Sequence, residues 1–400
     1  MVVYPRLKSG IRLKLYISLT MLLFILLTCR ENTSLLDIQS PPIITIPEQT
    51  EDGWETGSLE EVGIRTAPIL DMLSYLKNQP EHHVHSILLI KEAKLVFETY
   101  YKGHAYQYYN PNFQGEDIIF DRETPQCTHS VTKSITSICV GICRDLGYLQ
   151  NIEEKVFALF PEYSGLSSPE KDQITIRHLL TMSSGLEWNE QDVDMRDPSN
   201  DLIHLAQSHD PLGYILGKPL VDPPGTHFNY NGGNTNLLSE IIRKYSGMKL
   251  DLLSETYLFT PLGIIDFQWQ YFYNGLVYAS GDVYLRPRDM AKLGYLFLKK
   301  GIWKGERILS EEWIMESTQT HMTVFMGGYG YQWWTSTFKI RSSDHVVYYV
   351  PNYSAIGWGG QSIKIFPSLD MVAVFTGSNY VSRSSNNDLV REYILPAVLF

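Results

Sequence analysis

The feature that most constrains this chain of 400 residues is a serine and a lysine placed three residues apart where a helix is predicted to begin. The segment reads Ser130-Val131-Thr132-Lys133, and Gly147 offers a helix end. Apolar residues recur between them at helical spacing: Val131, Ile135, Ile138 and Ile142. Positions i and i+3 of a helix share a face, so the Lys133 amine can reach the Ser130 hydroxyl. Free N–H groups and the helix dipole favour negative charge at such a helix start, so the pattern predicts a nucleophile site.

The lysine supplies the activation that a serine needs. A serine becomes a good nucleophile only when a neighbouring base takes its proton. Lys133 is a candidate base, because burial favours the neutral form of an amine. The alternative is a helix N-cap serine followed by a solvated lysine, since Ser-x-x-Lys alone is a weak signal.

Composition and charge limit the classes of protein to which this chain can belong. Hydrophobic residues make up 44% of the chain and charged residues 19%, which is typical of a globular protein with a substantial core. The net charge of −11 argues against nucleic-acid binding and against docking on anionic lipid. Cys127, Cys139 and Cys143 show no paired disulfide framework, and the last two are expected to be core residues.

The first 28 residues are predicted to be a signal peptide. Four basic residues precede an apolar run over residues 15–27, which is short for a membrane span. The run ends at Thr28-Cys29, which resembles a lipoprotein cleavage box, and the alternatives are an uncleaved anchor or plain secretion. We therefore expect export to the periplasm or cell surface, with a lipid or signal anchor as the only membrane contact. Residues 29–53, rich in proline, are predicted to be a tether.

Strand signals lie at both ends of the remaining chain. Residues 86–90 and 95–101 predict a hairpin, and residues 345–350, 361–366 and 371–376 predict further strands. The segments expected to be helical cover residues 67–76, 234–246, 287–300 and 389–399. This pattern predicts an α/β fold in which an antiparallel sheet is built from both chain ends and carries flanking helices. The sheet lobe would span about 54–129 and 321–400, and a mostly helical lobe about 130–320.

Three further segments resemble signatures of the β-lactamase-related and penicillin-binding serine hydrolases. They are residues 174–186, residues 224–238 around the motif Tyr-x-Asn, and Gly357-Trp358-Gly359-Gly360-Gln361, where the third motif (Lys-Thr-Gly) would fall. The matches keep their order over residues 54–400. The resemblance implies a β-lactamase/transpeptidase-like fold, most similar to the esterase and 6-aminohexanoate-oligomer hydrolase branch.

The resemblance also implies roles for individual residues. Ser130 would be the nucleophile, Lys133 its base, and Tyr230 the phenol that passes a proton to the leaving group. The positive charge of Lys133 is expected to lower the pKa of Tyr230. The backbone N–H groups of Ser130 and Gln361 would form the oxyanion hole. Neither a metal nor another cofactor is implied.

Two positions depart from the family pattern. Gly232 stands where Tyr-x-Asn has its asparagine, and Asn231 or Asn234 is expected to substitute in substrate binding. Trp358 stands where a cation would bind a substrate carboxylate. With Gly359 and Gly360, it is predicted to bind an uncharged acyl group instead.

The sequence therefore predicts a monomeric serine hydrolase that cleaves a small-molecule ester or linear amide through an acyl-enzyme. The alternatives are a D-alanyl peptidase, a weak β-lactamase, or a non-catalytic acyl sensor of the same fold. A histidine run, His82-His83-Val84-His85, has no second ligand cluster beside it and leads into a predicted strand, so no metal site is expected there.

Overall fold

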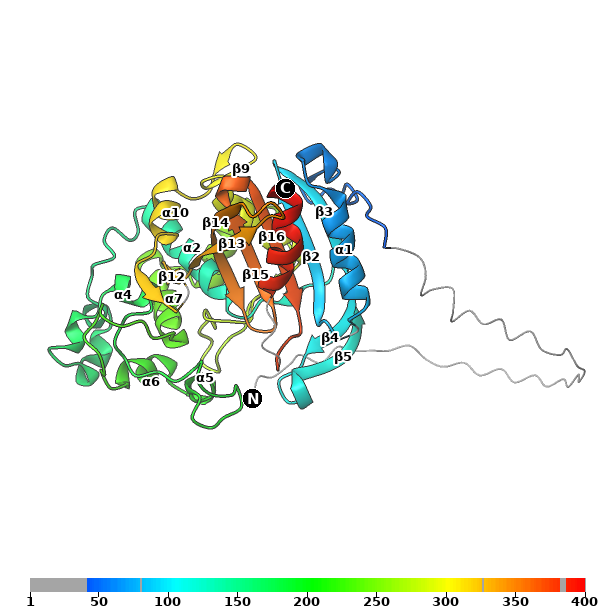
Figure 1. Ribbon diagram of the computed structural model, residues 1–400. Coiled ribbons are helices and arrows are strands. Elements are labelled where there is room, and N and C mark those ends of the chain that lie inside the picture. The colour runs from blue at the N-terminus through cyan, green and yellow to red at the C-terminus, as the bar shows by residue number, and fades with distance from the viewer. Residues whose placement is uncertain (1–41, 80, 326, 382–385, 400) are drawn as a thin grey trace, which may run out of the picture. The chain divides into compact units, whose positions relative to one another are not determined.

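The fold is organised around a nine-stranded sheet whose strands come from both ends of the chain (Figure 1). In spatial order the strands are β1 (Glu55–Thr56), β3 (Lys94–Tyr100), β2 (Val84–Lys91), β16 (Met371–Gly377), β15 (Gln361–Phe366), β14 (Val347–Gly357), β13 (Trp334–Arg341), β12 (Gly327–Tyr329) and β11 (Met322–Val324). β16 pairs with β2 and so joins the carboxy-terminal strands to the amino-terminal hairpin. Neighbouring strands are antiparallel except for β1 and β3, which run parallel. The predicted fold class and hairpin are confirmed.

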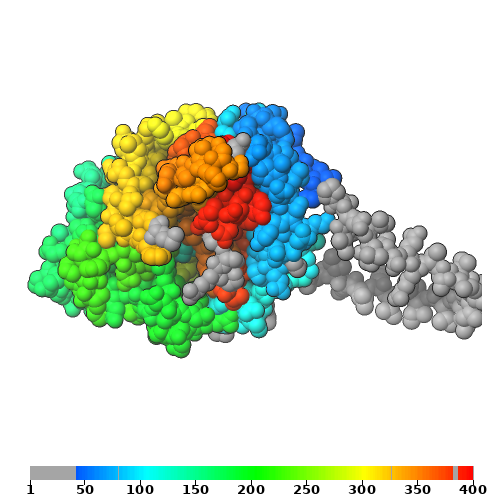
Figure 2. Space-filling view, viewed as in Figure 1, coloured from blue at the N-terminus to red at the C-terminus, as the bar shows by residue number. Residues whose placement is uncertain are grey.

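Side chains alternate between the two faces of the sheet and feed two separate cores. On β16, Val372 and Val374 join one core, whereas Ala373 and Phe375 join the other. The first core includes α2 (Val131–Asp145) and α9 (Pro287–Leu298), which pack on the central strands. The second is covered by α1 (Thr66–Lys77) and by the carboxy-terminal turns α11 (Asn386–Leu389), η7 (Val390–Ile394) and α12 (Leu395–Leu399). In Figure 2 the carboxy-terminal segment (red) lies between the orange strands and the blue amino-terminal part.

Residues between the two groups of sheet strands form mainly helices and turns. The helices there, besides α2 and α9, are α3 (Val156–Leu159), α4 (Ile176–Leu180), α5 (Asp201–Gln207), α6 (Pro211–Gly217), α7 (Gly232–Ser246), α8 (Leu250–Ser254) and α10 (Glu311–Ser317). Over all the described residues, the further short helical turns are η1 (Glu60–Val62), η2 (Pro111–Phe113), η3 (Pro161–Leu166), η4 (Lys171–Gln173), η5 (Glu255–Phe259) and η6 (Pro367–Leu369). The remaining strands are β4 (Lys102–Tyr106), β5 (Gln114–Ile119), β6 (Gln126–Cys127), β7 (Phe267–Gln268), β8 (Tyr284–Leu285), β9 (Ile302–Trp303) and β10 (Glu306–Arg307). α2 packs against α7, which brings two of the predicted motifs into contact.

The computed structural model describes residues 42–79, 81–325, 327–381 and 386–399. The predicted signal peptide, residues 1–28, and Cys29 lie outside these residues. Within the described ranges, no helix is long and apolar enough to cross a membrane.

The compact unit begins at Ile44, inside the segment predicted to be a tether. The buried Arg288 guanidinium holds this beginning in place. It donates hydrogen bonds to Asp52 Oδ2 at 2.9 Å, to Glu98 Oε1 at 2.6 Å and to the Glu48 carbonyl oxygen at 3.0 Å. Folded structure therefore starts before Trp54, because a distant arginine on α9 binds residues that show no periodic pattern of their own.

Candidate active site

Ser130 lies at the start of α2, as the sequence predicts, and Lys133 faces it. The Lys133 Nζ atom is 3.0 Å from Ser130 Oγ. Ser130 is the N-cap residue of α2, yet its side chain makes no capping hydrogen bond. Lys133 is only 2% exposed. These two facts count against the alternative of a capping serine beside a solvated lysine, since the hydroxyl does not cap the helix and the amine is buried.

The Lys133 amine is held by three oxygen atoms. Besides Ser130 Oγ, it donates to the Ser280 carbonyl oxygen at 2.8 Å and lies 3.4 Å from Glu190 Oε1. Burial lowers the pKa of Lys133, but the charges and hydrogen bonds of Glu190 and Tyr230 outweigh it and leave that pKa above its ordinary value. Burial favours the neutral amine as expected, but the neighbouring groups favour the charged form more strongly, and no motif in the sequence marks the carboxylate among them.

Tyr230 joins the same group from the other side. Its ring centroid is 4.7 Å from Lys133 Nζ, and both Ser130 and Lys133 act to lower the pKa of its phenol. Burial raises the pKa of Tyr230, and the negative charge of Glu190 adds to that effect. Lys133 opposes the rise but does not reverse it. The predicted trio is thus assembled, although the pKa of the phenol moves upward rather than downward.

The strand end that carries Gln361 lies against the backbone of the nucleophile. Gly357 pairs with Gln361 where β14 meets β15. A Cβ atom added at Gly357 would lie 2.2 Å from the Thr128 carbonyl oxygen and 3.2 Å from the Ser130 nitrogen. The Gln361 side chain points elsewhere, since its Oε1 accepts from the Gly377 N–H at 3.2 Å. The turn between β14 and β15 therefore lies close to the Ser130 backbone, and the N–H groups of Ser130 and Gln361 stay the predicted oxyanion donors.

Comparison with known proteins is consistent with this geometry. The sequence model described as Beta-lactamase matches residues 86–393, which is more than half of the chain. This chain belongs to the beta-lactamase family. A 6-aminohexanoate-dimer hydrolase of Paenarthrobacter ureafaciens is 26% identical over 271 residues, which cover 61% of this chain and 64% of that relative. The match thus spans less than two thirds of the relative's length.

Two solved structures show the same fold. A 6-aminohexanoate-dimer hydrolase candidate from Bacillus anthracis aligns with a TM-score of 0.64 at 18% identity, covering 89% of this chain and 90% of the other. A family VIII carboxylesterase aligns with a TM-score of 0.62 at 15% identity, covering 88% and 100%. At these identities the two structures show the fold that this chain shares with them.

We predict that Gly357→Ala lowers kcat for ester hydrolysis by roughly a hundredfold, because the added methyl group pushes against Thr128 and Ser130 and displaces an oxyanion donor. Steady-state kinetics with a p-nitrophenyl ester measures the effect. Gly165→Ala is the matched control, since a Cβ atom there has nothing within 4 Å. An alanine variant at position 357 with the wild-type kcat would contradict the predicted oxyanion hole.

Trp358 lies among aromatic side chains from distant parts of the chain. Its ring centroid is 4.6 Å from that of Phe113, 4.8 Å from that of Tyr380 and 5.6 Å from that of His129. Tyr106 completes this cluster, at 6.1 Å from Trp358. His129 directly precedes the nucleophile, so this aromatic cluster borders Ser130. The sequence pointed only to Trp358, because the other four residues belong to no motif.

Gly359 and Gly360 shape the turn that carries Trp358. Both have positive φ angles, +80° and +96°, in the region where glycine is favoured. A Cβ atom at Gly359 would lie 2.3 Å from the Tyr380 ring. These two glycines therefore set the position of the tryptophan.

The two asparagines expected to replace the missing family residue are both buried at the start of α7. Asn231 is fully buried and caps α7, with its Oδ1 accepting from the Asn234 N–H at 3.1 Å. Asn234 is also fully buried. The space beside Gly232 is instead filled by Glu190. Glu190 follows the 174–186 segment and was missed, since a lone glutamate in a loop carries no motif.

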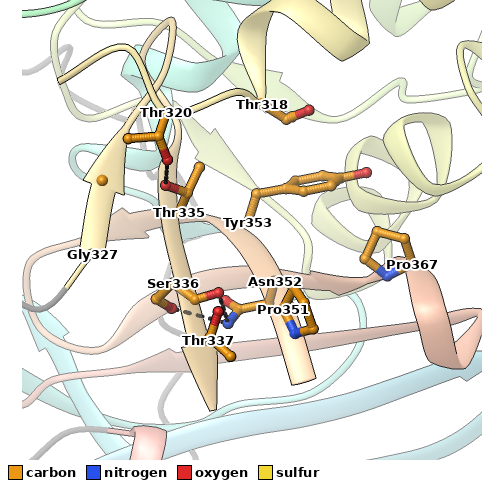
Figure 3. A pocket seen from close by; sticks show the side chains of 11 residues that line it. Thr318, Thr320, Gly327, Thr335, Ser336, Thr337, Pro351, Asn352, Tyr353 and Pro367 are labelled. Carbon is orange, nitrogen blue, oxygen red and sulfur yellow. Dashed lines mark hydrogen bonds between the residues drawn. The ribbon is translucent and has the colours of Figure 1, made fainter. Parts of the chain in front are cut away.

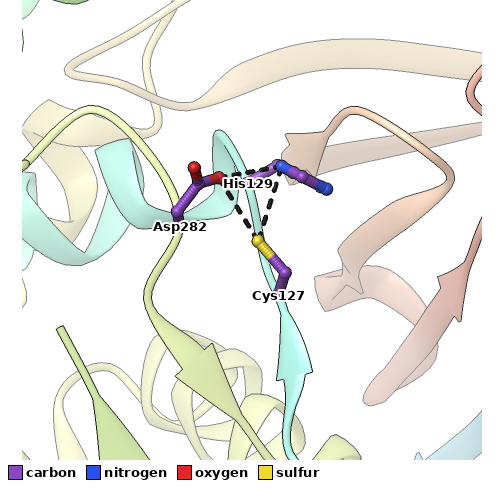
Figure 4. A group of neighbouring side chains, drawn as sticks. All are labelled: Cys127, His129 and Asp282. Carbon is purple, nitrogen blue, oxygen red and sulfur yellow. Dashed lines mark hydrogen bonds and ion pairs between the residues drawn. The ribbon is translucent and has the colours of Figure 1, made fainter. Parts of the chain in front are cut away.

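A second polar group lies next to the nucleophile (Figure 4). His129 Nδ1 is 2.8 Å from Asp282 Oδ1, and Cys127 Sγ is 3.3 Å from the same oxygen. The three ligand atoms lie within 4.8 Å of one another and could hold a metal ion. Asp282 can equally accept hydrogen bonds from both neighbours, which accounts for the arrangement without an ion. Away from this group, His85 stacks on Phe120, and burial lowers its pKa to about 4.

A hollow of about 530 Å³ lies away from the catalytic group (Figure 3). Hydroxyl and amide side chains line it, including Thr320, Thr335 and Asn352. Thr320 and Thr335 hydrogen-bond to each other at 2.7 Å. Neither Ser130 nor Lys133 is among its lining residues, so this hollow is separate from the group around Ser130.

Proposed function

We propose that this protein hydrolyses an ester or a linear amide through a covalent acyl-enzyme on Ser130. The contact of 3.0 Å between the buried Lys133 amine and the Ser130 hydroxyl carries the proposal. The aromatic cluster around Trp358 supports an uncharged acyl or leaving group, because aromatic rings bind apolar surface and offer no charge.

In the proposed reaction, Ser130 Oγ attacks the substrate carbonyl carbon while its proton passes to Lys133 in the neutral form. The backbone N–H groups of Ser130 and Gln361 hold the oxyanion. The proton then passes through the Tyr230 phenol to the leaving oxygen or nitrogen, whose bond to the carbonyl carbon breaks. Lys133 and Tyr230 then take a proton from water, and the resulting hydroxide attacks the carbonyl carbon of the acyl-enzyme. The bond from that carbon to Ser130 Oγ breaks, the acid leaves, and the proton returns to Ser130 Oγ.

A substrate with a carboxylate is the second candidate, as a D-alanyl peptidase or a weak β-lactamase would need. Arg196 is the observation that favours it. Its guanidinium lies 3.8 Å from the centroid of the Phe113 ring, so a cation borders the aromatic cluster. Arg196 is exposed and donates to the Asn110 carbonyl oxygen at 3.0 Å, which directs part of its charge elsewhere.

Intact mass after separate incubation with a fluorophosphonate and with a penicillin tests the proposal. We expect a fluorophosphonate adduct on Ser130, none in Lys133→Ala, and no adduct from the penicillin. Labelling by the penicillin that is lost in Arg196→Ala would instead favour the carboxylate-bearing substrate. No adduct from either reagent would point to the non-catalytic acyl sensor.

We also propose that the protein is exported and acts as a monomer on a small molecule. The basic and apolar pattern of residues 1–28 is what supports export.

A further inference from the structure

We propose that Glu190 is a positioning residue that takes the place of the side chain missing at Gly232 and determines the pH above which Lys133 can accept the Ser130 proton. This inference rests on the proposed function, because it concerns the activation of the same nucleophile.

The two oxygens of Glu190 have separate partners. Oε2 accepts a hydrogen bond from the Gly232 N–H at 2.7 Å and another from Trp188 Nε1 at 2.9 Å. Oε1 faces the Lys133 amine at 3.4 Å. The Glu190 side chain is 6% exposed. One oxygen is therefore anchored by two donors while the other is directed at the proposed base.

The glycine and the glutamate depend on each other. A Cβ atom at Gly232 would lie 2.9 Å from Glu190 Oε2 and 2.9 Å from Leu202 Cδ2. Such contacts are closer than side chains tolerate, so no side chain fits at position 232 while Glu190 keeps its place. The glycine and the carboxylate thus go together, and the site holds a carboxylate in exchange for the neutral amide that the resembled Tyr-x-Asn motif would supply.

That exchange changes the charge at the lysine. The titratable groups that act on Lys133 are Glu190, Tyr230 and Asp282. From its loop, Glu190 also contributes to the raised pKa of Tyr278 and Tyr329. Burial lowers the pKa of Lys133 and Glu190 raises it, with a net rise. Lys133 must lose a proton before it can accept one, so reactivity of Ser130 should increase as pH rises through that raised pKa. Without the carboxylate charge, burial dominates and the same increase should occur at lower pH.

The rate of Ser130 labelling by a fluorophosphonate, followed by intact mass as a function of pH, tests this inference without knowledge of the substrate. In Glu190→Gln we expect the pH of half-maximal labelling to fall by roughly one to three units. Glu187→Gln is the matched control, since Glu187 is an exposed carboxylate in the same segment. Glu190→Asp retains the charge and should keep a midpoint close to that of the wild type.

A second charge-free variant, Glu190→Ala, leaves Gly232 and its contact with Leu202 unchanged and gives a second measurement should Glu190→Gln fold poorly. Its midpoint should match the lowered one. An unchanged midpoint in the charge-free variants, or a labelling rate reduced equally at every pH, would overturn the role of Glu190 while leaving the nucleophile intact. A wild-type protein that is not labelled at any pH would overturn both this inference and the proposed function.

Discussion

Alanine at position 130 is expected to lower kcat for p-nitrophenyl ester hydrolysis by at least about a thousandfold. The substitution removes the only atom that can form the acyl-enzyme in the proposed reaction. It also leaves the Lys133 amine with its two remaining partners, Glu190 and Ser280, so the buried charge stays paired. Circular dichroism should therefore report an unchanged fold while steady-state kinetics reports the loss.

Ser137→Ala is the matched control for this prediction. Ser137 is fully buried on the same helix, α2, and its hydroxyl has no hydrogen-bond partner among the described residues. Its removal should leave kcat within about twofold of the wild type, because surface and packing are nearly unchanged. If the alanine variant at position 130 kept a tenth or more of the activity, another residue would have to be the nucleophile.

The largest expected effect on stability comes from Arg288→Met, which should lower the free energy of unfolding by about 3–5 kcal/mol. The substitution leaves the carboxylates of Asp52 and Glu98 without the guanidinium that neutralises them in a partly buried site. It also releases the Glu48 carbonyl oxygen. The midpoint of urea denaturation, followed by tryptophan fluorescence, measures the change.

Arg391→Met is the control for the stability measurement. Arg391 forms an exposed ion pair with Asp388, and such pairs contribute about 0–1 kcal/mol. The midpoint should therefore move little. Equal midpoints for the two methionine variants would show that the Arg288 contacts are worth no more than a surface pair.

The parts of the fold that the sequence predicts correctly follow from local residue patterns. The hairpin of β2 and β3 and the strands β15 and β16 are short runs of β-branched and apolar residues bounded by turns. α2 follows from its apolar spacing and from Ser130 and Lys133 at its start. Each of these signals lies within a single stretch of chain, and the sheet follows from strands at both ends.

The electrostatics of the site could not be predicted in the same way. Glu190 reaches Lys133 from 57 positions along the chain, and nothing in its own surroundings marks it. Its charge reverses the expected direction of the pKa of Lys133 and contributes to the rise for Tyr230. The capping role of Asn231 at the start of α7 is likewise not predicted, because the residue pattern indicates that helix only from residue 234. The direction of a pKa shift and the choice of a helix cap both depend on which segments of the chain come together in the fold.

The Arg288 contacts also have a mechanical consequence. They join the first folded residues to α9, which packs on the centre of the nine-stranded sheet and not at its edge. Tension that arrives along the chain from its amino-terminal side is therefore borne first by short polar bonds to Glu48 and Asp52, before it reaches the short edge strand β1. We therefore expect a pull on that side to load α9 and the centre of the sheet before it loads β1.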